Sequence, residues 1–142
     1  MGVLLLASCR TNVQHRPWGY LRLGKVQSFL KEETHLPDDR LIVRYDGRGL
    51  SVMSTSCTYD LTALKPLDGG KVWASEETPS RYDKFGKVLA GPAVADLPYY
   101  ELKIGEGELD GPADTLYVVI GSERPKDWRL QIPTALATQN NG

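Results

Sequence analysis

The chain has 142 residues, a mass of 15.7 kDa and a formal net charge of -1, with 17 Lys and Arg residues against 18 Asp and Glu residues. This length corresponds to one domain with its own hydrophobic core. The balanced charge argues against a nucleic-acid binder, and no apolar run is long enough for a membrane-spanning helix. Cys9 and Cys57 are too few for a disulfide-rich scaffold or a four-cysteine metal site.

The first nine residues contain an apolar run that ends in Leu6-Ala7-Ser8-Cys9, which resembles a bacterial lipobox. In such signals the Cys becomes the lipidated first residue of the mature chain. The run is short and no Lys or Arg precedes it, so a complete signal would begin upstream; a short hydrophobic tail or an N-terminal strand is the alternative. We therefore expect a signal at 1–8, lipidation at Cys9, a polar tether at 9–18, and a periplasm-facing position in the bacterial envelope.

Short apolar or alternating segments separated by Gly, Pro and Asp follow, and they predict strands. These segments are 21–29, 40–45, 50–55, 71–74, 87–89, 99–104 and 115–120. The sequence Asp46-Gly47-Arg48-Gly49 predicts a hairpin connection. Residues 31–39 are expected to form a polar loop or at most a helical turn, and residues 132–142 a flexible tail. The pattern predicts an all-β domain over 19–131, built from antiparallel sheets in a sandwich or barrel-like form.

The strongest motifs lie in the second half of the chain. They are Ser80-Arg81-Tyr82-Asp83, Gly86, Gly91-Pro92-Ala93 and Leu97-Pro98-Tyr99, with Trp73 ahead of them. With these motifs, residues 54–98 resemble the cluster-binding part of a Rieske iron–sulfur domain, and weaker likeness extends over 20–130. The resemblance implies a Rieske-like fold with a small inserted loop subdomain at about 55–92, and it makes Gly91-Pro92-Ala93 the family's proline loop.

The resemblance also implies where an iron–sulfur cluster would be bound. The family holds a [2Fe–2S] cluster through two Cys and two His, in the order Cys-x-His and then Cys-x-x-His. The corresponding positions are Cys57, Tyr59, Ser75 and Thr78 for the ligands, and Thr62 and Glu77 for the family's disulfide. Only Cys57 can supply a thiolate, and one thiolate cannot hold such a cluster, so no cofactor is expected.

Two further residues keep their family identity. Ser80 and Tyr82 stand where the family donates hydrogen bonds to sulfur atoms. Without a cluster, we expect them to satisfy backbone groups of the loops. His15 and His35 lie upstream, on the tether and the polar loop, and offer no replacement ligands.

Weaker candidate sites involve carboxylates and the Cys57 thiol. Oxygen ligands from the two loops could bind a hard cation such as Ca²⁺ or Mg²⁺, although solvated loop tips paired with Lys65 or Arg81 are the favoured interpretation. Cys57 could be a reactive thiol, although a half-buried cysteine without chemistry is favoured. The acidic loop near residue 110 could also bind a cation, although a solvated hairpin is the favoured interpretation. The candidate cation site of the two loops comprises Tyr59, Asp60, Glu76 and Glu77, and that of the acidic loop comprises Glu106, Glu108, Asp110 and Asp114.

The sequence therefore predicts a non-catalytic Rieske-like domain that has lost its cluster. It would act as a binding, scaffold or accessory subunit, and the resemblance implies a protein partner in a respiratory or redox complex. One alternative is an electron-transfer protein that binds [2Fe–2S] or another metal through unusual ligands. The other is a thiol-based role of Cys57.

Overall fold

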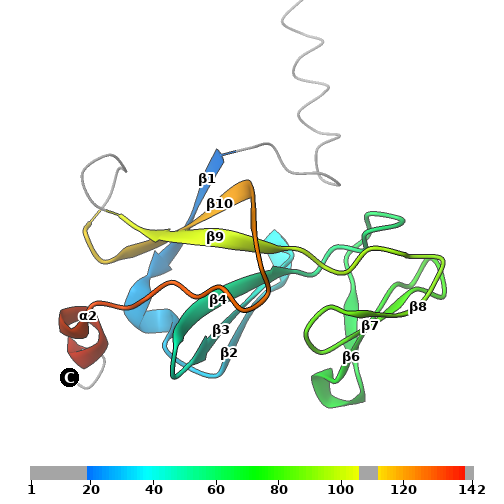
Figure 1. Cartoon of the computed structure of the whole chain (residues 1–142), viewed down its shortest axis with the longest axis horizontal. Coiled ribbons are helices and arrows are strands. Elements are labelled where there is room, and N and C mark those ends of the chain that lie inside the picture. The colour runs from blue at the N-terminus through cyan, green and yellow to red at the C-terminus, as the bar shows by residue number, and fades with distance from the viewer. Residues whose placement is uncertain (1–18, 106–111, 140–142) are drawn as a thin grey trace, which may run out of the picture.

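The computed structural model describes residues 19–105 and 112–139, which form two antiparallel sheets (Figure 1). The larger sheet has the strand order β1-β10-β9-β4-β3-β2, and the smaller one has the order β5-β6-β7-β8. The smaller sheet is inserted between β4 and β9 of the larger one, which confirms the all-β fold with an inserted subdomain. The strands are β1 (Gly19–Lys25), β2 (Glu33–Leu36), β3 (Leu41–Asp46), β4 (Gly49–Ser54), β5 (Lys65–Leu67), β6 (Val72–Ala74), β7 (Arg81–Asp83), β8 (Val88–Ala90), β9 (Tyr99–Ile104) and β10 (Thr115–Arg124).

Short helices complete the described chain. Three are 3-10 helices, namely η1 (Val26–Phe29), η2 (Pro37–Asp39) and η3 (Asp68–Gly70), and the fourth is the α-helix α2 (Thr134–Gln139). None of the helices in the described residues is long and apolar enough to cross a membrane.

The hairpin of β3 and β4 separates two hydrophobic cores. Leu41 and Val43 of β3 point into a large core with residues of β4, β9 and β10, whereas Ile42 between them joins a smaller core under the inserted sheet. Alternate residues of a strand face opposite sides of its sheet, so a strand with both faces covered is buried along its whole length. All six residues of β4 are accordingly buried. The inserted sheet thus rests on the same strands that form the main core.

The predicted hairpin connection is confirmed, because Asp46 pairs with Gly49 across a two-residue turn. Gly49 has a φ of 137°, and a Cβ atom at this position would collide with the carbonyl oxygen of Leu130. The backbone of Leu130 lies so close because it exchanges two hydrogen bonds with Leu50, of 3.0 and 2.8 Å. The chain after β10 is therefore tied to the start of β4.

Several segments differ from the sequence prediction. Residues 33–36, expected in a polar loop, form β2 at the edge of the larger sheet, where His35 pairs with Ile42. Their polarity suits an edge strand with one exposed face. β5 and β7, for which the sequence predicted no strand, have three residues each. Residues 26–29 form η1 instead of continuing a strand. The segment expected to be a tail contains α2, whose Leu136 packs on the large core.

Candidate functional site

Two loops of the inserted unit carry the positions that correspond to cluster ligands in the Rieske family. The first loop (residues 55–64) connects β4 to β5, and the second loop (residues 75–80) connects β6 to β7. Backbone hydrogen bonds close the first loop on itself: Cys57 N donates to Thr62 O over 2.8 Å, and Leu64 N donates to Thr55 O over 2.9 Å. Each loop therefore starts and ends on a strand and presents its side chains from a fixed backbone.

The carboxylate of Asp60 joins the two loops. Its Oδ2 accepts hydrogen bonds from Ser75 Oγ at 2.6 Å and from Thr78 Oγ1 at 2.8 Å. Its Oδ1 accepts hydrogen bonds from Thr62 Oγ1 at 2.5 Å and from Thr62 N at 3.0 Å. Three positions that correspond to cluster ligands or to the disulfide in the family thus donate to one carboxylate. We call these four residues the Asp60 network.

The hydrogen bonds of this network keep Asp60 ionised. Partial burial by itself would raise the pKa of Asp60, but the hydrogen bonds from Ser75, Thr62 and Thr78 outweigh it and hold the pKa well below its ordinary value. A carboxylate that receives several donors is stabilised in its charged form. The Asp60 carboxylate therefore remains ionised and accepts hydrogen bonds near neutral pH.

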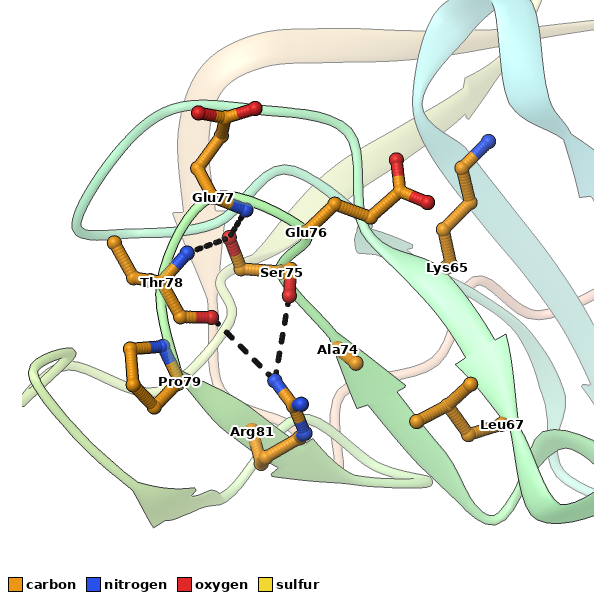
Figure 2. A pocket seen from close by; sticks show the side chains of 9 residues that line it. All are labelled: Lys65, Leu67, Ala74, Ser75, Glu76, Glu77, Thr78, Pro79 and Arg81. Carbon is orange, nitrogen blue, oxygen red and sulfur yellow. Dashed lines mark hydrogen bonds between the residues drawn. The ribbon is translucent and has the colours of Figure 1, made fainter.

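Ser75 is fully occupied by its neighbours. Its Oγ accepts hydrogen bonds from Glu77 N at 3.0 Å and from Thr78 N at 3.2 Å, which turns the second loop back on itself (Figure 2). Arg81 Nη1 reinforces the same turn by donating to the carbonyl oxygens of Ser75 and Thr78. With two donors on its lone pairs and its hydrogen on Asp60, the Ser75 hydroxyl has no capacity left for a metal ion.

Cys57 is buried and forms a hydrogen bond with Tyr82, whose hydroxyl lies 3.3 Å from Cys57 Sγ. Thr58 Oγ1 donates its hydrogen to Ala95 O, with 2.7 Å between the two oxygens, because a carbonyl oxygen can only accept a hydrogen bond. Thr58 Oγ1 must then accept the hydrogen of Tyr82, 2.9 Å away. Tyr82 has no second hydrogen, so the thiol of Cys57 donates to the Tyr82 oxygen. Burial raises the pKa of Tyr82.

These contacts correct the expectation of a half-buried cysteine, since Cys57 is 0% exposed. A buried thiol that donates its own hydrogen lacks the exposure and the thiolate character of a reactive cysteine. The thiol-based role considered for Cys57 thus finds no support in its surroundings.

Ser80 and Tyr82 both serve backbone groups, in keeping with the local role expected for them. Tyr82 OH accepts a hydrogen bond from Thr58 N at 3.0 Å, and Ser80 Oγ accepts one from Ala93 N at 3.1 Å. The second bond ties the second loop to the turn Gly91-Pro92-Ala93, in which the Gly91–Pro92 peptide bond is cis. Thr78 Oγ1 also contacts Ser80 Oγ at 3.0 Å, so this turn is continuous with the Asp60 network.

The cation site considered for Tyr59, Asp60, Glu76 and Glu77 does not form. Tyr59, Glu76 and Glu77 are exposed, whereas both oxygens of Asp60 face hydroxyl and amide donors. Asp60 is thus no solvated loop tip either, which corrects the favoured interpretation for this residue. Among residues 19–105 and 112–139, no group of three or more His, Cys, Asp or Glu side chains is placed to hold a metal ion.

Arg81, one of the expected partners of these carboxylates, donates instead to carbonyl oxygens of the second loop. Of the second acidic cluster, Glu106, Glu108 and Asp110 lie outside the described residues, as do Cys9 and His15. His35 lies in β2 with its ring centroid 5.8 Å from that of Trp73, rather than in a loop.

The donor set of the two loops does not fit a Rieske-type [2Fe–2S] cluster, which needs two thiolates and two imidazoles. Cys57 supplies the one sulfur of the set and lies against the Tyr82 hydroxyl, and the hydroxyls of Ser75 and Thr78 donate to Asp60. Tyr59, at the remaining ligand position, is 58% exposed. These residues therefore do not supply the ligand set through which a Rieske centre transfers electrons.

Sequence reasoning placed Asp60 among the solvated loop tips and did not find it as the centre of the site. Its partners Ser75 and Thr78 lie 15 and 18 residues away, so no local pattern reports the contact. The local signal is Asp60-Leu61-Thr62, in which an Asp side chain accepts from the amide two residues on, as in an Asx turn.

Comparison with known proteins gives limited similarity. Neither a protein-family model nor a curated protein sequence matches the chain. Among solved structures, the cyanobacterial plasma membrane Rieske protein PetC3 from Synechocystis PCC 6803 is 18% identical, with a TM-score of 0.42 over 69% of this chain and 97% of the other. Rieske domains are the family that the sequence resembles.

Two similar structures contain ferredoxins. The ferredoxin of carbazole 1,9a-dioxygenase from Nocardioides aromaticivorans IC177 is 14% identical, with a TM-score of 0.40 over 72% of this chain and 98% of the other. A complex of reduced oxygenase and oxidized ferredoxin in carbazole 1,9a-dioxygenase gives 15% identity and a TM-score of 0.41 over 77% of this chain and 99% of the other. At this level of similarity, function has to be inferred from the contacts of this chain itself.

Proposed function

We propose that this protein is a non-catalytic Rieske-like domain in which the Asp60 network joins the two loops that would otherwise share an iron–sulfur cluster. The observation that carries the proposal is the position of Asp60 Oδ2, within 2.6 Å of Ser75 Oγ and 2.8 Å of Thr78 Oγ1. Two positions that must supply a thiolate and an imidazole instead supply hydroxyl hydrogens to a carboxylate. The loops are thereby held together without a cofactor.

A domain of this kind acts by binding rather than by chemistry. The hydrogen bond between Thr58 Oγ1 and Ala95 O brings the first loop against the residues that follow the proline loop. Next to these two residues lie Tyr59 and Val94, which are 58% and 92% exposed. Exposed aromatic and apolar side chains on a fixed backbone favour a protein partner. The sequence resemblance suggests the class of partner, namely a subunit of a redox or respiratory complex.

The proposal includes an envelope location through a lipid on Cys9, which rests on the lipobox resemblance of residues 6–9. Labelled palmitate should be incorporated into the protein made in a bacterial host. The label should disappear in Cys9→Ser and persist in the matched variant Cys57→Ser. Incorporation that survives Cys9→Ser would show that Cys9 is not the lipidated residue.

The loss of the cluster can be tested by restoring the ligands. The wild-type protein and the triple variant Tyr59→His/Ser75→Cys/Thr78→His are incubated with iron and sulfide without oxygen and then desalted. We expect no stoichiometric iron and no [2Fe–2S] spectrum in the wild type, because its donor set does not fit the cluster. The triple variant, which regains the missing ligands beside Cys57, is expected to bind more iron than the wild type.

Visible and EPR spectra with elemental analysis report on both proteins. Stoichiometric [2Fe–2S] in the wild type would contradict the proposal and make the protein an electron carrier with unusual ligands. Stoichiometric amounts of another metal in the purified wild type would also contradict it, because no group of three or more His, Cys, Asp or Glu side chains among the described residues is placed to hold one.

A further inference from the structure

A second site lies on the other side of the inserted unit, where the two sheets meet. It is a cavity of about 350 Å³ between the β3–β4 hairpin, the turn after β7 and the chain after β10. This volume falls in the range of pockets that bind small molecules, about 300–1,000 Å³. We call it the basic pocket. It shares no residue with the Asp60 network, so an inference about it does not depend on the proposed function.

The lining of the basic pocket is positively charged although the whole chain has a net charge of -1. Its cations outnumber its carboxylates by two, so the pocket attracts anions. Two of the carboxylates are already paired: Glu33 with Arg44 at 3.1 Å, and Asp46 with Arg129 at 3.0 Å. The cationic side chains are Arg44, Arg48, Lys84, Lys126 and Arg129.

Aromatic rings form another part of the wall. Phe85 is 49% exposed, and the guanidinium carbon of Arg44 and the ammonium of Lys84 lie 5.0 and 5.6 Å from its ring centroid. Tyr45 and Tyr99 also line the cavity. A bare inorganic anion would leave the exposed part of the Phe85 ring uncovered, whereas an anion with a flat apolar body would cover it.

The wall is held in place before any ligand binds. Arg44 is clamped because its Nη2 donates to the carbonyl oxygen of Lys84 at 2.6 Å and its Nε to Glu33. Tyr99 OH donates to the carbonyl oxygen of Phe85 at 3.0 Å and fixes the turn that carries the ring. A preformed wall lowers the entropy lost on binding.

One cation of the pocket differs from the others in its contacts. The ammonium of Lys126 is exposed and makes no ion pair with the described carboxylates, whereas Arg44, Lys84 and Arg129 are each paired with one. We propose that the basic pocket binds a small aromatic carboxylate, with the carboxylate group at Lys126 and the ring against Phe85.

The test uses the full chain and indole-3-acetate as the probe, with binding followed by amide shifts in NMR spectra. A ligand of this size with ordinary binding efficiency has a dissociation constant of about 1 mM. Lys126→Met is expected to weaken binding at least about fivefold, and Phe85→Leu by a similar factor, because each removes one of the two contacts. Lys71→Met, an exposed lysine outside the pocket, is the matched control and should leave the affinity unchanged.

Two further probes separate charge from shape. Indole-3-acetamide has the same ring without the charge, and inorganic phosphate has the charge without a ring; both should bind at least about fivefold more weakly than indole-3-acetate. Equal affinity for either probe, no saturable binding of indole-3-acetate below about 10 mM, or unchanged affinity in Lys126→Met would each overturn the proposal.

Discussion

Replacing Asp60 with Asn keeps the shape of the side chain but changes one acceptor into a donor. If the amide oxygen stays on Thr62, the NH₂ group faces Ser75 Oγ and Thr78 Oγ1. Ser75 Oγ already accepts two backbone N–H groups and cannot accept a third. Two hydrogen bonds to a charged group are therefore lost. At roughly 1–1.5 kcal/mol each, Asp60→Asn should lower the free energy of unfolding by about 2–3 kcal/mol near pH 7.

The effect of Asp60→Asn should depend on pH in a defined direction. The folded-state pKa of Asp60 lies below its ordinary value, so its ionised form is favoured by folding. This contribution is complete above the unfolded-state pKa of about 3.9 and is lost as the pH falls towards the folded-state pKa. The difference in unfolding free energy between wild type and Asp60→Asn should therefore be largest near neutral pH and should shrink below about pH 4.

Urea unfolding followed by tryptophan fluorescence measures this difference, because Trp73 is buried in the core under the inserted sheet. The matched control is Asp68→Asn, an exposed Asp in the same unit, which should change the unfolding free energy by less than about 0.5 kcal/mol. The reasoning is refuted if Asp60→Asn is as mild as this control, or if its effect is the same at pH 3 and pH 7.

Three further substitutions test other features. Gly49→Ala should lower the free energy of unfolding by at least about 2 kcal/mol, because its Cβ meets the Leu130 carbonyl, whereas Gly47→Ala, with nothing within 4 Å, should have little effect in the same urea assay. Leu61 has a φ of 64°, so Leu61→Gly should be about 0.5–1 kcal/mol more stable than Leu61→Ala; equal stability would contradict the strain. Tyr82→Phe leaves the Thr58 amide without its acceptor and should cost about 1–3 kcal/mol; unchanged hydrogen exchange at that amide would contradict this role.

The sequence predicted those parts of the fold whose signals are local. The hairpin at Asp46-Gly47-Arg48-Gly49 depends on turn chemistry that neighbouring residues carry, and it is confirmed by the pairing of Asp46 with Gly49. In contrast, β2 consists of polar residues that become a strand because β3 offers an edge to pair with. Likewise, β5 is exposed at all three positions, so burial left no pattern in its sequence. These strands are set by tertiary pairing rather than by propensity.

The same distinction holds for the site. Motif positions singled out Ser80 and Tyr82, which accept hydrogen bonds from Ala93 N and Thr58 N in the structure. The role of Asp60 depends on Ser75 and Thr78, which reach it across the gap between loops. No single residue of the chain predicts that contact, because it needs the carboxylate of Asp60 and the hydroxyls of Ser75 and Thr78 together.

The Asp60 network differs in kind from the covalent links that it replaces in the proposal. A disulfide stabilises mainly by restricting the unfolded chain, typically by about 2–4 kcal/mol, and does so at any pH. Asp60 stabilises the folded loops directly, through hydrogen bonds to its charge, and only while it is ionised. Because the loops are joined by hydrogen bonds alone, they can separate without a change in redox state. In the function proposed above, the first loop presents Tyr59, and the chain after the proline loop presents Val94, to a partner, and this requires neither iron nor an oxidised cysteine pair.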